Sequence, residues 1–109
     1  MKRLAGKIAI VTGSSSGIGK AIALTFAEEG ARVVVAARRQ HLCEQTVKQI
    51  REKGGEAMAI QTDVTDESQV ERLITQTVQQ YGRLDILVNN AGIGGEAELP
   101  RPAPKRLTR

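Results

Sequence analysis

Four short apolar segments recur along the chain, and none of them alternates apolar with polar residues. They occupy residues 8–11, 33–36, 57–60 and 86–88. Continuous apolar runs of this length are typical of strands that are covered on both faces, as in a parallel sheet. The pattern therefore predicts four buried strands rather than strands with one solvent-exposed face.

Three segments with helical spacing separate these strands, at residues 17–29, 40–53 and 66–81. The apolar stripes that define them are Ile18, Ile22 and Phe26; then Leu42, Thr46, Val47 and Ile50; then Val70, Leu73, Ile74, Val78 and Tyr81. Glycines that favour helix ends follow each segment, and Thr65 is the expected N-cap of the third helix.

The element order is βαβαβαβ, which predicts an α/β fold with helices on both faces of a parallel sheet. We expect a Rossmann-like, doubly wound sheet with strand order 3-2-1-4, incomplete in the number of its strands. Successive strands are added on one side of the first strand up to the third, and the fourth is added on its other side. Ligands of such sheets bind in the crevice at the carboxyl ends of the strands on either side of that switch point.

The regular pattern stops after Val88, and residues 89–95 are typical of a turn. We expect residues 1–95 to form a partial dinucleotide-binding domain and residues 96–109 to form a basic, proline-rich, disordered tail. Residues 1–99 hold 12 basic and 12 acidic side chains, so the four basic residues of the tail supply the whole net charge of +4. Nucleic-acid binding through so short a tail, with no aromatic residue nearby, is disfavoured.

Cysteine content and hydropathy exclude several classes of protein. The single Cys43 rules out an internal disulfide, and together with His41 it provides too few ligands for a metal site. Both are expected on the second helix, Cys43 as a packed thiol and His41 at the surface. No segment approaches the roughly 20 apolar residues of a membrane span, and a cytoplasmic location is expected.

The first strand runs into a loop rich in Gly and Ser. Gly13, Gly17 and Gly19 allow a tight turn and a close backbone approach, while Ser15 and Ser16 add hydroxyl donors. Amide groups at the start of the following helix favour a diphosphate. A plain flexible turn is the alternative. A P-loop is excluded, because Ser14 and Ala21 occupy positions where that motif needs Gly and a hydroxyl residue.

The loop, Thr-Gly followed by three residues and Gly-Ile-Gly, resembles that of the short-chain dehydrogenase/reductase family. Two further motifs in the expected order strengthen the resemblance: Asp63-Val64 after the third strand, and Asn-Asn-Ala-Gly at residues 89–92 after the fourth. The resemblance implies binding of a nicotinamide dinucleotide and, in full-length members, hydride transfer between NADP(H) and an alcohol or carbonyl compound. Ile18 is a cofactor contact on the same grounds.

The resemblance also bears on the choice between NADP and NAD. An acid at the end of the second strand would bind the ribose hydroxyls of NAD, but Ala37 stands there. Arg38, assisted by Arg39, is the expected ligand of a 2′-phosphate, and NADP is favoured with NAD as the alternative. Ser16 weighs against NADP, since many members that use it have a basic residue at that position.

The remaining motif residues have two possible roles each. Asp63 is expected to accept a hydrogen bond from the adenine amino group or to begin the turn that leads to Thr65. The resemblance implies two roles for Asn89 and Asn90: contact with the cofactor ribose, or bonds that tie the central strands together. The structural role is favoured for Asn89, whereas Asn90, with Ala91 and Gly92, is expected beside the cofactor.

The resemblance places the reactive Ser and the Tyr-x-x-x-Lys pair of the family after Asn-Asn-Ala-Gly. The only tyrosine here is Tyr81, and Asp85 stands four residues later. We therefore assign no catalytic residue and expect cofactor binding without turnover. A non-catalytic nucleotide-sensing or interaction module is the alternative. A natural truncation, a frameshift and half of a split enzyme are equally compatible with the ending, and the exposed edge of the fourth strand favours self-association.

Overall fold

The computed structural model describes residues 2–14 and 17–90 of the chain. The elements in order are β1 (Ile8–Thr12), α1 (Gly17–Glu28), β2 (Arg32–Ala37), α2 (Gln40–Glu52), β3 (Glu56–Gln61), α3 (Glu67–Tyr81) and β4 (Ile86–Asn89). All seven predicted elements are present, and each of their bounds lies within one residue of the predicted one.

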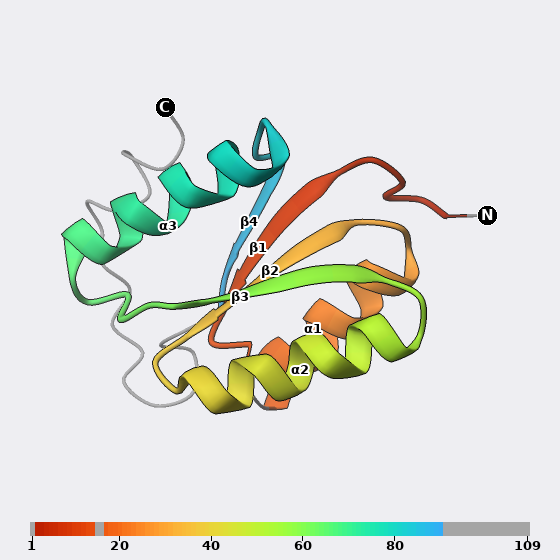
Figure 1. The fold of residues 1–109 in the computed structure, drawn as a ribbon, viewed down its shortest axis with the longest axis horizontal. Helices are drawn as coiled ribbons and strands as arrows, with labels where there is room; N and C mark the ends of the chain where they lie inside the picture. Colours follow the sequence, from red (N-terminus) through yellow and green to blue (C-terminus); the bar gives the residue numbers. More distant parts are fainter. Residues whose placement is uncertain (1, 15–16, 91–109) are drawn as a thin grey trace.

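The strands form one parallel sheet with the order β3-β2-β1-β4, which confirms the predicted topology. Helices α1 and α2 cover one face of this sheet and α3 covers the other (Figure 1). The chain therefore has the Rossmann-like, doubly wound architecture expected from its sequence.

Alternate residues of the strands supply two cores, one on each face of the sheet. Val11, Val33 and Val35 belong to the core beneath α1 and α2, while Ile10 and Val34 belong to the core beneath α3. All five residues of β1 are buried, because this strand has neighbours on both sides and helices above and below. This explains why its sequence is apolar without alternation.

The predicted apolar stripe of α1 packs on the sheet only in part. Ile22 and Phe26 are partly buried against the core, whereas Ile18 is 66% exposed. The buried residues of this helix are Gly19, Ala23 and Ala27, whose small side chains let the helix axis approach the strands closely. Ile18 is therefore not part of the packed face.

The N-cap of α3 is also one residue later than predicted. Asp66 has an extended backbone, and its carboxylate accepts a hydrogen bond from the Ser68 amide at 3.0 Å. Thr65 instead donates its hydroxyl to Asp63, at 2.6 Å, so it cannot cap the helix. At the other end Gly82 adopts a left-handed φ of 90° and its amide binds the Val78 carbonyl, as the sequence predicted.

The edge strand β3 is tied to the helix that precedes it. The Arg51 guanidinium, in the last turn of α2, donates to the Ala57 carbonyl at 2.9 Å. At the opposite end of the sheet, β4 pairs with β1 alone among the described strands, and its residues Ile86, Leu87 and Val88 are only partly buried. The expected domain boundary at residue 95 and the expected tail lie outside the described residues.

In the part of the chain that the structure describes, no helix combines the length and the apolar character that crossing a bilayer requires.

Leu73 is the main anchor of α3 and is 1% exposed. We predict that Leu73→Ala lowers the free energy of unfolding by about 2–5 kcal/mol, because it leaves a cavity between α3 and the sheet. Val78→Ala on the same helix is the matched control, since Val78 is 40% exposed and its truncation should cost less than about 1 kcal/mol. Urea unfolding measures both, and equal losses would contradict the placement of α3.

Candidate functional site

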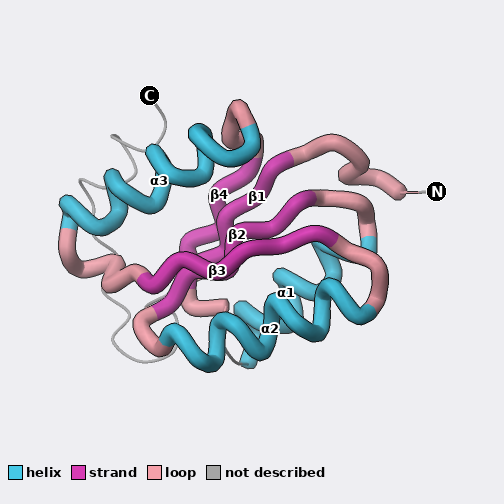
Figure 2. The backbone as a smooth tube through the Cα atoms, viewed as in Figure 1, coloured by secondary structure: helices cyan, strands magenta, loops and turns pink. Residues whose placement is uncertain are grey.

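The predicted site residues that the structure describes follow the carboxyl ends of the strands. Because all four strands are parallel, their carboxyl ends share one edge of the sheet, and the loops that follow β1, β2 and β3 leave the sheet on the same side (Figure 2). Gly13 follows β1, Arg38 follows β2, Asp63 lies two residues after β3, and Asn90 follows β4.

The start of α1 lies against the end of β1 more closely than a side chain would allow. A Cβ atom placed on Gly19 would overlap the Gly13 carbonyl oxygen and lie 2.6 Å from the Asn90 side-chain nitrogen. Gly13 and Gly17 have left-handed φ values of 64° and 61°. Gly13 and Gly17 are therefore needed for their left-handed backbone conformation, and Gly19 is needed because no side chain fits beside the Gly13 carbonyl.

The two asparagines at the carboxyl end of β4 bind the end of β1 and the turn that follows it. The Thr12 hydroxyl, at the end of β1, lies 3.1 Å from the side-chain oxygen of Asn89, the last residue of β4. The Asn90 amide donates to the Gly13 carbonyl at 3.3 Å. The structural role expected of Asn89 agrees with its contact. Asn90 has a structural contact as well, which is the alternative role of this motif.

Ser14 is a central residue of the turn that sequence reasoning missed. It is fully buried, and its hydroxyl donates to the Val11 carbonyl at 2.6 Å and accepts from the Ala36 amide at 3.2 Å. A second buried hydroxyl, that of Thr46 on α2, donates to the Ser14 carbonyl at 3.3 Å. The available signal was Thr46 itself, because a hydroxyl within an apolar stripe needs a buried partner.

Arg38 and Arg39 are both exposed, in the turn between β2 and α2. The Arg38 carbonyl accepts a hydrogen bond from the Gln61 side chain at 3.0 Å, which ties this turn to the end of β3. Arg39 is the N-cap position of α2, and it provides no side-chain hydrogen bond to that helix. The two exposed guanidinium groups thus lie at the carboxyl ends of the strands, on the same side of the sheet as the glycine turn.

Asp63 makes the structural contacts of its turn. Its carboxylate accepts hydrogen bonds from the Thr65 hydroxyl at 2.6 Å and the Thr65 amide at 3.0 Å. These bonds, with a smaller contribution from the positive charge of Arg38, lower the pKa of Asp63 below its ordinary value of 3.8. The structure thus agrees with the turn-forming role, and it brings Asp63 within the electrostatic reach of Arg38.

The other predicted residues divide into two groups. Gly17 and Ile18 begin α1 and are exposed, and Val64 is a partly buried turn residue next to Asp63. The remaining four predicted residues lie outside the described part of the chain: Ser15, Ser16, Ala91 and Gly92.

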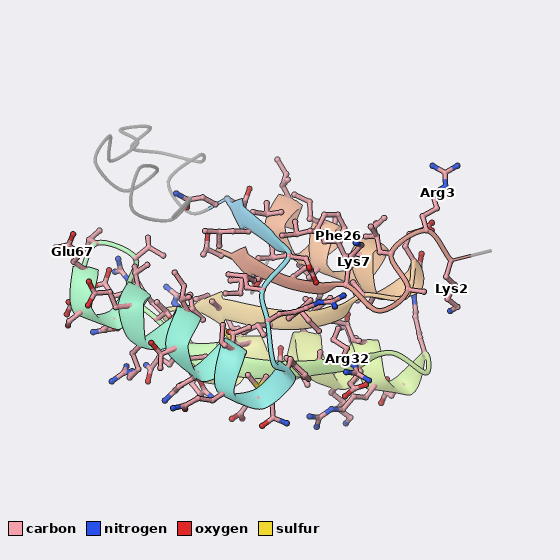
Figure 3. All side chains as sticks on the ribbon, turned by 90° about the horizontal axis from the view of Figure 1, so that it is seen from above. Lys2, Arg3, Lys7, Phe26, Arg32 and Glu67 are labelled. Atoms are coloured by element: carbon pink, nitrogen blue, oxygen red, sulfur yellow. The ribbon has the colours of Figure 1, made fainter. Side chains whose placement is uncertain are left out.

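Tyr81 lies far from this edge. The Arg32 guanidinium sits 5.8 Å from the centre of its ring, and Arg32 begins β2, at the amino ends of the strands. Glu67, the first residue of α3, lies at one end of the molecule, well away from Arg32 (Figure 3). Burial raises the pKa of the Tyr81 phenol above its ordinary value of 10.0. Its position beside Arg32, at the amino ends of the strands, keeps this tyrosine away from the candidate site.

Cys43 is fully buried and His41 is exposed, as expected of groups without a chemical role. Burial raises the pKa of the Cys43 thiol, so that it stays protonated. Among the described residues, no group of three or more His, Cys, Asp or Glu side chains is arranged to hold a metal ion.

The glycine turn leaves the start of α1 uncovered at Gly17. A Cβ atom added at Gly17 would meet no atom within 4 Å, so the backbone at the start of α1 faces open space. The first turn of a helix carries amide groups without intrahelical partners, and its dipole favours an anion. A parallel α/β sheet with such a turn after its first strand defines the Rossmann-like class of nucleotide-binding folds.

Within this class, the chain belongs to the short chain dehydrogenase family, whose pattern it matches over residues 7–107. It is 44% identical over 100 residues to the 7alpha-hydroxysteroid dehydrogenase of Escherichia coli K12, an alignment that covers 92% of this chain and 39% of that protein. It is also 44% identical to versicolorin reductase 1 of Aspergillus parasiticus, over 98% of this chain and 41% of the relative.

The crystal structure of a hydroxysteroid dehydrogenase from Escherichia coli superimposes with a TM-score of 0.80 and 46% identity. That alignment covers 83% of this chain and 38% of the other. The chain therefore spans about two fifths of the length of the curated relatives that it matches.

We predict that Gly19→Ala weakens or abolishes nicotinamide dinucleotide binding, because the added methyl group pushes α1 away from the Gly13 carbonyl. Overpacking of this kind should also cost about 1–3 kcal/mol of stability. The control is Gly54→Ala, which replaces a glycine with φ of 89° in open space. The control should lose about 1–2 kcal/mol yet keep its affinity. Calorimetric titration of the folded variants measures this, and equal affinities would contradict the assignment.

The Thr65 bonds to Asp63 lead to a pH prediction. Because the folded-state pKa of Asp63 is lowered, its carboxylate stabilises the fold above the ordinary value of 3.8. That stabilisation is lost as the pH falls through the lowered folded-state pKa. Thr65→Val should raise the pKa of Asp63 toward 3.8, as followed by NMR of the carboxyl carbons.

Ser68→Ala is the control for this experiment. The Ser68 hydroxyl is the main cause of the lowered pKa of Asp66, so this change should move the titration of Asp66 and leave that of Asp63 in place. An Asp63 titration that Thr65→Val does not move would contradict the turn geometry.

Proposed function

We propose that this chain binds NADP(H) as the cofactor-binding portion of a short-chain dehydrogenase/reductase-type oxidoreductase. The observation that carries the proposal is the close contact of Gly19 with the Gly13 carbonyl beneath the open start of α1. The lack of side chains at Gly17 and Gly19 supports a close approach of a diphosphate to the turn after β1. The proposed cofactor contacts are the residues predicted from the sequence, including Ser15, Ser16, Ala91 and Gly92.

The preference for NADP rests on the turn after β2. Ala37 ends that strand, and two exposed arginines follow it. A 2′-phosphate beside Arg38 would gain a charge-assisted, bidentate hydrogen bond, whereas the ribose hydroxyls of NAD would find no carboxylate there. Asp63 is close enough for its charge to act on Arg38, which supports placing the adenosine between the ends of β2 and β3.

For full-length proteins of this family we propose hydride transfer between NADP(H) and an alcohol or carbonyl compound. Two relatives are named as a dehydrogenase of hydroxysteroids and a reductase of versicolorin, and both names fit this class of substrate. For these 109 residues alone we propose binding without turnover, because the sole tyrosine packs beside Arg32 at the far end of the sheet.

Self-association through β4 stays a prediction from the sequence. It is supported by the position of β4 at the end of the sheet and by the partial exposure of its three apolar residues. An exposed, apolar edge strand is prone to pair with another chain.

Titration of the purified chain with NADP and NAD tests the proposed function. We expect saturable binding of NADP, weaker binding of NAD, and no oxidation of NADPH with a panel of carbonyl compounds. Absence of heat and of spectral change with both dinucleotides would overturn the proposal, and steady NADPH consumption would overturn the expected lack of turnover.

Arg38→Ala should weaken NADP binding by about 10- to 100-fold, because a charged hydrogen bond contributes about 1.5–3 kcal/mol. NAD binding should change little, since NAD lacks the 2′-phosphate. The control is Arg72→Ala, which removes an exposed positive charge from α3. If Arg38→Ala weakened the binding of NADP and of NAD equally, Arg38 would not recognise the 2′-phosphate.

A further inference from the structure

The fully buried residues include two whose polar side chains connect the glycine turn to the rest of the fold. These are Ser14 in the turn and Thr46 on α2, each 0% exposed. Buried hydroxyls must find partners, because a desolvated polar group without a hydrogen bond is costly. The partners of these two hydroxyls lie in three different elements, and that arrangement carries the inference.

Ser14 connects the ends of two strands. Its hydroxyl donates to the Val11 carbonyl of β1 and accepts from the Ala36 amide of β2, at 2.6 and 3.2 Å. The Ala36 carbonyl in turn accepts from the Gly13 amide at 2.8 Å. Without the Ser14 hydroxyl, the Ala36 amide would lose the partner that holds it to the turn.

Thr46 connects the same turn to α2. Its hydroxyl is 3.3 Å from the Ser14 carbonyl and 3.3 Å from the Leu42 carbonyl of its own helix. The side chain therefore spans from the second turn of α2 to the glycine turn. It fixes the position of α2 relative to the end of β1, on the side of the sheet where the candidate site lies.

These contacts lie between the two halves of the proposed cofactor site. Ser14 is adjacent to Gly13, at the diphosphate turn, while its partner Ala36 is two residues before Arg38. A rigid link between Ser14 and Ala36 sets the separation between the diphosphate turn and the Arg38 turn. A ligand that touches both turns benefits from that fixed separation, and a ligand that touches only one does not.

We propose that Ser14, supported by Thr46, is a positioning residue that holds the diphosphate turn at the correct distance from Arg38. The inference rests on the proposed function, since it assumes that one dinucleotide spans both turns. It predicts that the loss of the Ser14 hydroxyl weakens a spanning ligand selectively and leaves the binding of its separate halves almost unchanged.

The test is an NMR titration of the ¹⁵N-labelled full chain with NADP, with adenosine 2′-monophosphate and with inorganic diphosphate. For Ser14→Ala we expect the Kd for NADP to rise about tenfold, as the loss of a buried hydrogen bond implies. The Kd values of the two half-ligands should stay within about twofold of wild type, since neither depends on the separation.

Two further variants keep the result interpretable. Thr46→Val leaves the Ser14 hydroxyl in place and should raise the Kd for NADP about threefold, again without an effect on the half-ligands. It provides the answer if Ser14→Ala does not fold. Thr77→Val is the control, because it removes another fully buried hydroxyl, which binds the Leu73 carbonyl at 2.8 Å on the opposite face of the sheet. Its NADP affinity should equal that of wild type.

Equal weakening of NADP and of both half-ligands in the Ser14 and Thr46 variants would overturn the inference, as would unchanged NADP affinity. If the wild-type chain binds none of the three ligands, the proposed function fails, and the inference fails with it. If the wild type binds NADP and the variants show no selective loss, only the role of Ser14 is disproved.

Discussion

The contact between Gly19 and the Gly13 carbonyl sets the geometry on which the site depends. It brings the start of α1 directly against the end of β1, at a distance that excludes even a methyl group. The Asn90 amide from the end of β4 binds the same carbonyl. Three elements therefore meet at one backbone oxygen, and the crevice of the doubly wound sheet opens beside it.

Most of the fold could be predicted because the strands are buried on both faces and are therefore apolar throughout, as β1 is. The strand order is that of the doubly wound sheet which the βαβαβαβ element order predicted. The packing face of α1 could not be predicted in the same way. Its periodic large residues, headed by Ile18, indicated one face, but the close approach of helix and sheet is made by Gly19 and Ala23, which contribute little to a hydropathy pattern.

The site divides along a similar line. The glycines, Arg38 and Asp63 were predicted because each directly follows or closely trails a strand, and parallel strands bring those positions to one edge. Ser14 and Thr46 were not, because the partner of a hydroxyl depends on which elements pack together. Thr65 shows the same limit, since its hydroxyl binds Asp63 in preference to capping the helix. Short polar side chains have several local partners to choose from, and sequence spacing does not select among them.

The bond from Arg51 to the Ala57 carbonyl has a consequence for how the chain reaches its fold. Its two residues are six positions apart, so the bond needs only one local turn and no distant partner. A partly folded chain in which α2 has met β3 already carries a guanidinium along the outermost strand. Unprotected strands of folding intermediates are sites of misassembly, and here the protecting bond lies within a single helix–strand unit and needs no partner from the remaining sheet.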